Sequence, residues 1–173
     1  MVRSKSETRV ICDAGPIIHL DEVGCLDVMG DFVEIVIPDC VRQEVMMHRT
    51  ISFESTGLPF RVAPPVPAID KSLQTMCKIY SLDAGEVAAL NILNRDPGLV
   101  FLTDDAAARL VATKLGFKVH GTIGVLTRAI RRDLMKAEEV INVLNLLPKV
   151  STLYLKASLL EEIISCIKNE FVL

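Results

Sequence analysis

Four short apolar runs, separated by helical patterns, constrain the fold of this chain most strongly. They are rich in β-branched residues and apolar on both faces, as strands are in a parallel sheet that helices cover on both sides. The runs are 9–12 (RVIC), 34–38 (EIVIP), 99–103 (LVFLT) and 117–121 (FKVHG). Helices are predicted over 15–31 (in two pieces, broken at Gly24), 38–48, 69–79, 83–95, 105–115, 122–133, 136–147 and 153–171. This alternation predicts an α/β fold with right-handed crossovers.

The length of 173 residues fits one domain. Half of the residues are hydrophobic and only 5% are aromatic, which predicts an aliphatic core large enough to be stable alone. Residues 50–67 contain four prolines and are predicted to form a long surface connection.

The composition narrows the cell compartment and the partners. Five widely scattered cysteines have no zinc-finger spacing, and their odd number argues against a disulfide framework. We therefore expect buried thiols in a cytoplasmic protein. No signal peptide is recognised, and no apolar run approaches the roughly 18 residues that a membrane span needs. The net charge of −3 means that any binding of nucleic acid must use local basic patches.

The last predicted helix has an apolar stripe along one side, formed by Leu160, Ile163, Ile164, Ile167 and Phe171. We expect this stripe to pack on the domain. Contact with a second copy or another protein is the alternative, and we expect the chain to form a homodimer or a higher oligomer.

Several acidic residues lie in unusual places. Asp13 directly follows the first strand and Asp104 follows the third, so both should lie at the carboxyl edge of the sheet, where sites form in open α/β folds. On a helical wheel Glu44 falls between Cys40 and Val41, within an apolar stripe.

Glu86 likewise projects between Leu90 and Leu93, toward the apolar side of its helix. Burial of an unpaired charge is unfavourable, so these positions need an explanation.

Each acid also has a purely structural explanation. Asp13 could cap the helix that starts near Pro16, and Glu44 could reach water along its stem. Asp83 and Glu86 have the spacing of a capping box. Asp104 or Thr103 could cap the helix after the third strand, and Asp105 is four residues before Arg109, at the spacing of a surface ion pair. Capping does not explain why two strand ends and two apolar stripes would converge.

A divalent metal ion explains the convergence better. Two carboxylates 4 Å apart repel each other by about 4 kcal/mol at an effective dielectric constant near 20. Mg²⁺ or Mn²⁺ prefers oxygen ligands and keeps several waters, one of which can attack a phosphodiester. The sequence therefore predicts a hydrolytic metal site.

Four stretches of the chain resemble the PIN-domain family, the fold of VapC-type toxin ribonucleases, and within it the branch whose first strand ends in DAGP. They occur in the family's order and are VICDAGPIIHL, EIVIPDCVRQEV, LDAGEVAALNIL and VFLTDDAAARLVATKLGFKVHGTIGVLTRA. The resemblance implies a PIN-like three-layer sandwich with a central, mainly parallel sheet flanked by helices. Residues 1–150 would form the nuclease domain, and residues 151–173 a C-terminal helical extension packed on the domain or on a partner.

The resemblance also implies a Mg²⁺- or Mn²⁺-dependent endoribonuclease, in many members the toxin of a toxin–antitoxin pair, with RNA as substrate and an antitoxin as partner. It places Asp13, Glu44 and Glu86 on the family's acidic positions. The last acidic position falls on Asp104 or Asp105: the family's T-x-D pattern favours Asp105, whereas the strand end and the Arg109 spacing favour Asp104. As the working hypothesis, the catalytic set is Asp13, Glu44, Glu86 and Asp104, and the metal ligands are Asp13, Glu86, Asp104 and Asp105.

Other residues are assigned smaller roles. Substrate contacts are predicted for Thr103, Arg109 and Arg128, although Thr103 could simply cap a helix. Arg128 belongs to a basic cluster with Arg131, Arg132 and Lys136, which could bind RNA phosphates or be a solvated face. The histidines His19, His48 and His120 have no metal-ligand spacing, so we expect structural roles for them.

A non-catalytic PIN-like module that binds RNA or protein is the alternative function. An aspartyl phosphotransferase is disfavoured because Gly15 stands two residues after Asp13.

Overall fold

The computed structural model describes residues 7–51, 53–67 and 70–171. Its strands are β1 (Arg9–Cys12), β2 (Glu34–Pro38), β3 (Phe60–Ala63), β4 (Val100–Leu102) and β5 (Val119–His120). Its helices are α1 (Ala14–Glu22), the 3₁₀ helix η1 (Leu26–Asp31), α2 (Asp39–His48), α3 (Lys71–Ile79), α4 (Ala84–Arg95), α5 (Ala106–Lys114), α6 (Thr122–Arg131), α7 (Ala137–Val150) and α8 (Ala157–Phe171).

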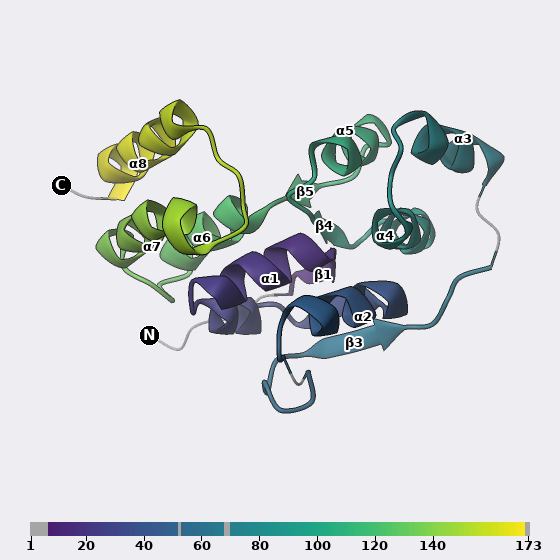
Figure 1. Ribbon diagram of the computed structural model, residues 1–173, viewed down its shortest axis with the longest axis horizontal. Coiled ribbons are helices and arrows are strands. Elements are labelled where there is room, and N and C mark those ends of the chain that lie inside the picture. Colours follow the sequence, from purple (N-terminus) through teal and green to yellow (C-terminus); the bar gives the residue numbers. More distant parts are fainter. Residues whose placement is uncertain (1–6, 52, 68–69, 172–173) are drawn as a thin grey trace.

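The five strands form one sheet in the order β3-β2-β1-β4-β5, and every pair is parallel. The strand β1 is central, with β2 on one side and β4 on the other. Because all strands run in one direction, their carboxyl ends meet at the same edge. The predicted α/β fold with a mainly parallel sheet is confirmed (Figure 1).

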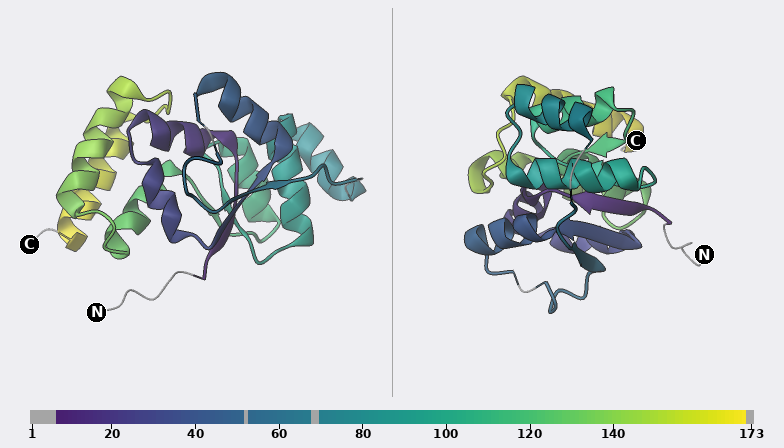
Figure 2. Two further views of the ribbon diagram at one scale, coloured as in Figure 1. Left: turned by 90° about the horizontal axis from the view of Figure 1, so that it is seen from below. Right: turned by 90° about the vertical axis from the view of Figure 1, so that its right-hand side faces the viewer.

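Alternating side chains of each strand enter two separate cores, one on each face of the sheet. Val10 and Cys12 of β1 pack with α1, α2, α6 and α7, whereas Ile11 between them packs with α3, α4 and α5. In β4, Phe101 faces the second core and Leu102 the first. Helices therefore cover both faces of the sheet, which gives the three-layer sandwich (Figure 2).

The strand β3 was not predicted from the sequence, where residues 50–67 were interpreted as a connection. It is a short edge strand with two exposed residues, so it lacks the continuous apolar pattern that revealed the others. Glu34 of β2 holds it by accepting a hydrogen bond from Arg61. The prolines that follow, Pro64 and Pro65, cannot donate to a neighbouring strand, which limits its length.

Helix boundaries differ from the prediction by a few residues. The α7 helix includes Pro148 in its last turn, three residues before its C-cap at Ser151. The α8 helix begins at Ala157 instead of residue 153, because Glu22 of α1 binds the backbone of Thr152 and the hydroxyl of Ser151. The predicted helix over 69–79 is α3, with its N-cap at Asp70; position 69 lies outside the described residues.

The C-terminal part forms a helical hairpin beside the sandwich. The α8 helix lies along α7, and Ile167 is buried there while Leu160, Ile163, Ile164 and Phe171 are partly buried. The helices α8 and α3 lie at opposite ends of the molecule (Figure 1).

Within the described part of the chain, none of the helices is both long enough and apolar enough to cross a bilayer. All five cysteines are free thiols; Cys12, Cys25 and Cys77 are buried as expected, Cys40 is half-buried and Cys166 is exposed.

Candidate active site

The register of the sheet places the ends of β1 and β4 side by side. Cys12 pairs with Leu102, and the Asp13 amide donates a 2.9 Å hydrogen bond to the Leu102 carbonyl. The first turn of α4 also lies against Asp13, since a Cβ at Gly85 would stand 3.4 Å from Asp13 Oδ1 and 3.0 Å from Val41 Cγ2. A glycine there allows α4 to approach the strand end closely.

Asp13 is the buried carboxylate at the centre of this edge, with 7% of its surface exposed. Thr103 Oγ1 donates to its Oδ2 over 3.2 Å. Burial raises the pKa of Asp13 to about 6; the nearby charges of Asp83 and Glu44 add to this shift, while bonds from Ala14 and Thr103 oppose it. The ionised form of Asp13 is therefore less stable here than in water.

Glu86, at 6% exposure, is the second buried carboxylate. It closes the capping box of α4: its Oε2 accepts from the Asp83 amide, and its own amide donates to Asp83 Oδ1, each at 2.9 Å. The capping explanation is thus correct, but it is incomplete. Burial, aided by the charges of Asp83, Asp105 and Asp13, raises the pKa of Glu86 to about 7.

Glu44 and Asp83 complete the acidic cluster, which we define as Asp13, Glu44, Asp83, Glu86 and Asp105. Glu44 is half-buried on α2, and burial together with the charge of Asp83 raises its pKa. Asp83 adds to the pKa shifts of Asp13, Glu44 and Glu86, yet the sequence identified it only as a cap. Its position three residues before Glu86 was the available signal, because a capping box holds its two carboxylates close together.

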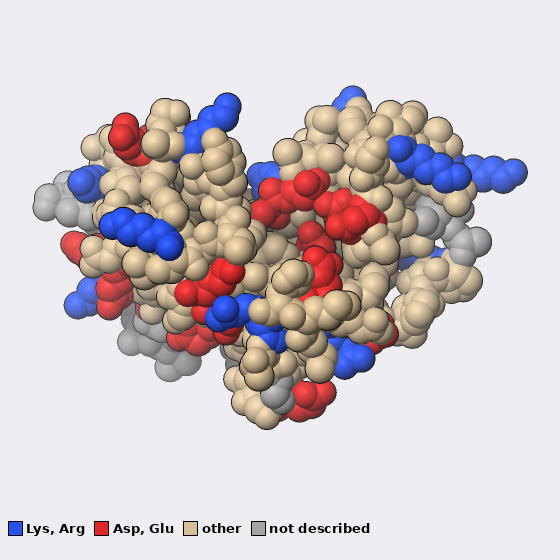
Figure 3. Space-filling view, in the orientation of Figure 1, with Lys and Arg blue, Asp and Glu red and all other residues tan. Residues whose placement is uncertain are grey.

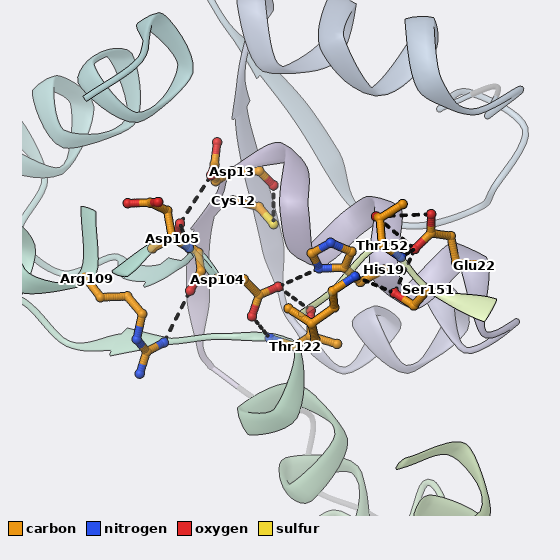
Figure 4. A network of polar contacts seen from close by, with 12 residues as sticks. Cys12, Asp13, His19, Glu22, Asp104, Asp105, Arg109, Thr122, Ser151 and Thr152 are labelled. Carbon is orange, nitrogen blue, oxygen red and sulfur yellow. Dashed lines mark hydrogen bonds and ion pairs between the residues drawn. The ribbon is translucent and has the colours of Figure 1, made fainter. Parts of the chain in front are cut away.

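The two adjacent aspartates after β4 have different surroundings (Figure 4). The Asp104 carboxylate points toward α1 and α6: its Oδ2 lies 2.8 Å from His19 Nδ1 and 2.6 Å from Thr122 Oγ1, and its Oδ1 accepts from the Thr122 amide at 2.8 Å. Although burial works in the opposite direction, these bonds keep the pKa of Asp104 below its ordinary value. The sequence predicts Asp104 as a catalytic residue and metal ligand; in the structure its two oxygens bind His19 of α1 and Thr122 of α6.

Asp105 is exposed and caps α5, accepting from the Ala108 amide at 2.7 Å. Its own amide donates to Thr103 Oγ1 at 3.2 Å, so one threonine hydroxyl connects Asp13 with Asp105. Asp105 contributes to the pKa shift of Glu86. Of the two candidates for the last acidic position, Asp105 is the one that lies with the cluster.

The predicted cationic contacts are divided between two places. Arg109 donates to the Thr103 carbonyl at 3.2 Å, close to the cluster. Arg128 lies over the Phe32 ring at 5.1 Å and forms a 2.6 Å ion pair with Asp31, which also binds Arg132. Arg131 binds Glu170. Most of the basic cluster is therefore engaged in contacts with η1 and α8.

The acidic cluster is visible as a red area at the centre of the face in Figure 3. Its donors are all carboxylate oxygens, which suit Mg²⁺ or Mn²⁺ and not a softer ion. Within residues 7–51, 53–67 and 70–171, no three His, Cys, Asp or Glu side chains stand close enough to form a metal-binding group. Magnesium is commonly held by one or two carboxylates, with water completing its shell, so the buried pair Asp13 and Glu86 fits this ion without a third direct ligand.

The fold and this acidic edge define an α/β protein with a site suited to hydrolysis of phosphate esters. The PIN-domain family model matches residues 9–169, and the chain belongs to the PIN-domain family. Members of this family are usually nucleases, which indicates a nuclease-type function for this chain. The matched range continues through most of α8. A comparison with curated proteins gave no match to the chain.

Proposed function

We propose that this protein is a metal-dependent endoribonuclease that hydrolyses RNA phosphodiester bonds at the acidic cluster. The observation that carries the proposal is the pair of buried carboxylates, Asp13 and Glu86, whose pKa values are raised to about 6 and about 7. Both become ionised near neutral pH only at a cost in free energy, and a dication between them removes that cost.

Asp13 and Glu86 are the residues that we propose as direct ligands of Mg²⁺ or Mn²⁺. Asp105, in the position first considered for Asp104, adds its negative charge beside them. A divalent ion bound there supplies charge neutralisation for the phosphate and makes a bound water more acidic. The side chains are already oriented for this task. Thr103 and the Ala14 backbone hold the carboxylate of Asp13. The capping box fixes one oxygen of Glu86 and leaves its other oxygen without a protein hydrogen bond among the described residues.

Glu44 stands at the rim of the cluster, half-buried and with a raised pKa, so it can hold a water and accept its proton. For Asp104 we propose a role other than that of a metal ligand. It is a positioning residue that fixes the β4–α5 turn to α1 and α6 and so determines where Asp105 stands.

The test is incubation of single-stranded and structured RNAs with the protein, with Mn²⁺ and with EDTA, beside the Asp13→Asn variant. We expect cleavage that requires the metal, gives internal products and is lost in the variant without loss of folding. Cleavage in EDTA, or undiminished cleavage by Asp13→Asn, would contradict the proposal.

A non-catalytic PIN-like module that binds RNA or protein is the second candidate. It is favoured by the separation of the carboxylates, which form no ready three-ligand group in the described part of the chain. Under this alternative, Mn²⁺ changes neither the RNA nor the melting temperature of the protein.

The nuclease proposal carries three further expectations: a toxin role, an antitoxin partner, and a homodimer or higher oligomer. Co-purification of the native protein from its source would test the partners.

A further inference from the structure

A groove of about 540 Å³ begins beside the acidic cluster and runs between α5 and α6 on one side and the start of the C-terminal extension on the other. Figure 3 shows this face hollowed between the part formed by α6–α8 and the part formed by α3–α5. The lining combines polar residues near the cluster (Asp104, Arg109 and His120) with residues of the extension (Leu153, Tyr154 and Leu155).

The wall of the extension is anchored, although residues 151–156 form no helix. Glu22 of α1 accepts hydrogen bonds from Ser151 Oγ at 2.7 Å, from the Thr152 amide at 2.9 Å and from Thr152 Oγ1 at 3.2 Å (Figure 4). Partial burial opposes the effect, but these bonds lower the pKa of Glu22. The segment that carries Tyr154 is thus fixed to the same helix that supports Asp13.

Two side chains in this groove have no evident role in stabilising the fold. Tyr154 is 83% exposed, although the neighbouring groove residues Leu153, Leu155 and Ile163 are aliphatic. Arg109 is half-buried and donates one hydrogen bond to the Thr103 carbonyl, which uses one of the five N–H donors of a guanidinium.

Several cationic side chains lie near His120, in the wall of the groove. Burial lowers the pKa of His120, and the positive charges of Arg109, Arg128, Arg131 and Lys118 lower it further. A polyanion that enters the cluster with its scissile phosphate would find Arg109 and an apolar surface next to it.

We propose that the groove between Arg109 and Tyr154 binds the single-stranded part of the RNA substrate next to the scissile phosphate, with Arg109 contacting a backbone phosphate and Tyr154 stacking on a base. Single-stranded RNA is recognised in this manner, by aromatic stacking of unpaired bases and by cations along its backbone. The inference rests on the proposed nuclease function and adds to it a binding surface and a role for the C-terminal extension.

The experiment measures binding of a fluorescently labelled single-stranded RNA of about ten nucleotides by anisotropy, in EDTA and at low ionic strength. The full chain is used, and EDTA separates binding from cleavage. Repulsion between the RNA and the acidic cluster weakens RNA binding to the same extent in all variants, so that ratios of Kd remain informative. The variants are Tyr154→Ala, Tyr154→Phe and Arg109→Gln. The matched control is Ile79→Ala, which removes a large exposed side chain (71% exposed) from α3 at the other end of the molecule.

We expect Tyr154→Ala to raise Kd roughly 5- to 100-fold, as loss of one stacked base does. Tyr154→Phe and Ile79→Ala should stay within about twofold of the wild type. Arg109→Gln should also weaken binding and reduce the slope of log K against log salt concentration by about 0.7. Equal RNA affinity of Tyr154→Ala and the wild type would overturn the proposal, and so would binding of a protein segment in the groove that leaves RNA affinity unchanged.

The two proposals can fail separately. If the wild type cleaves RNA with Mn²⁺ and Tyr154→Ala binds and cleaves equally well, the groove assignment is wrong and the nuclease function stands. If RNA affinity depends on Tyr154 but no metal condition gives cleavage, the groove assignment stands for a binding module. If the wild type neither binds nor cleaves RNA, both are wrong.

Discussion

Glu86 shows how one residue can serve both the fold and the site. Its carboxylate completes the capping box of α4, which stabilises the helix start, while burial among other acids makes its ionised form unfavourable. The sequence predicted both features but treated them as alternatives. The structure shows that they coexist, because a capping box uses only one of the two carboxylate oxygens.

The raised pKa of Glu86 predicts a pH effect in the metal-free protein. Its pKa is about 7 in the folded state against an ordinary value of 4.5, so folding disfavours the ionised form, and stability is lost as the pH rises from about 4.5 through about 7. Glu86→Gln lacks this loss. In EDTA we expect the free energy of unfolding of Glu86→Gln, relative to the wild type, to increase between pH 5 and pH 8 by about 1 kcal/mol or more. Urea titrations at the two pH values measure this difference in the free energy of unfolding. A difference that does not change with pH would show that folding does not disfavour the ionised form of Glu86.

Asp104 and Asp105 offer a matched pair of substitutions with opposite expected effects. Asp104→Asn weakens the bonds to His19 and Thr122, so we expect it to lower the free energy of unfolding by about 1–3 kcal/mol. Asp105→Asn keeps an N-cap of comparable strength, so stability in EDTA should change little while stabilisation by Mn²⁺ falls. Urea unfolding with and without Mn²⁺ separates the two. The reverse pattern, with Asp105→Asn unstable and Asp104→Asn defective only toward metal, would return Asp104 to the ligand set.

At the scale of elements, the central strands and nearly all helices could be predicted because each carries a continuous pattern: apolar runs for β1, β2 and β4, and periodic apolar positions for helices such as α5. The strand β3 could not, because an edge strand with exposed residues is stabilised mainly by its pairing with β2. Local pattern does not reveal such tertiary pairing. The start of α8 was displaced for a similar reason, since Glu22 is 129 residues distant in sequence from Ser151.

The turn between β5 and α6 depends on a glycine. A Cβ at Gly121 would collide with Asp104 Oδ1, and the side chain cannot withdraw without losing its bonds to Thr122. We expect Gly121→Ala to destabilise the protein by about 1–3 kcal/mol, measured as a shift of the urea midpoint. The control is Gly24→Ala, a position with open space around it and a positive φ of 68°, where the expected loss comes from backbone strain alone and leaves His19 and Asp104 undisturbed. An unchanged midpoint for Gly121→Ala would show that the Asp104 carboxylate is not held at this distance.

The anchoring of the extension can be tested at Glu22. Glu22→Ala removes the acceptor for Ser151 and Thr152, so residues 151–156 should exchange amide hydrogens faster while the central strands keep their protection. Stability should fall by about 1 kcal/mol, because these bonds are partly exposed to solvent. Hydrogen exchange followed by mass spectrometry measures the local effect. Unchanged exchange in this segment would mean that packing of α8, and not Glu22, holds the wall of the groove.

At the scale of the whole molecule, the parallel sheet explains why distant carboxylates meet. All strands end at one edge, so Asp13 after β1 and the turn after β4 lie together, and α2 and α4 bring Glu44 and Glu86 to the same place. The sequence predicted this edge and most of the acids. It did not predict that Asp104 turns away, because this depends on His19 and Thr122 in other elements. It identified Asp83 only as the cap of α4, although the capping box places Asp83 beside Glu86. The Arg128 pairing with Asp31 was hidden for the same reason.

The most direct test of the central claim, that these carboxylates share one pocket that a dication stabilises, is the melting temperature at pH 8 with and without Mn²⁺. For the wild type we expect a rise of about 5–10 °C at a Mn²⁺ concentration roughly 100 times Kd. Asp13→Asn should melt at a higher temperature than the wild type in EDTA, because it lacks a buried charge, and should gain little from Mn²⁺. A wild type that Mn²⁺ does not stabilise, or an Asp13→Asn variant that it stabilises equally, would contradict this account.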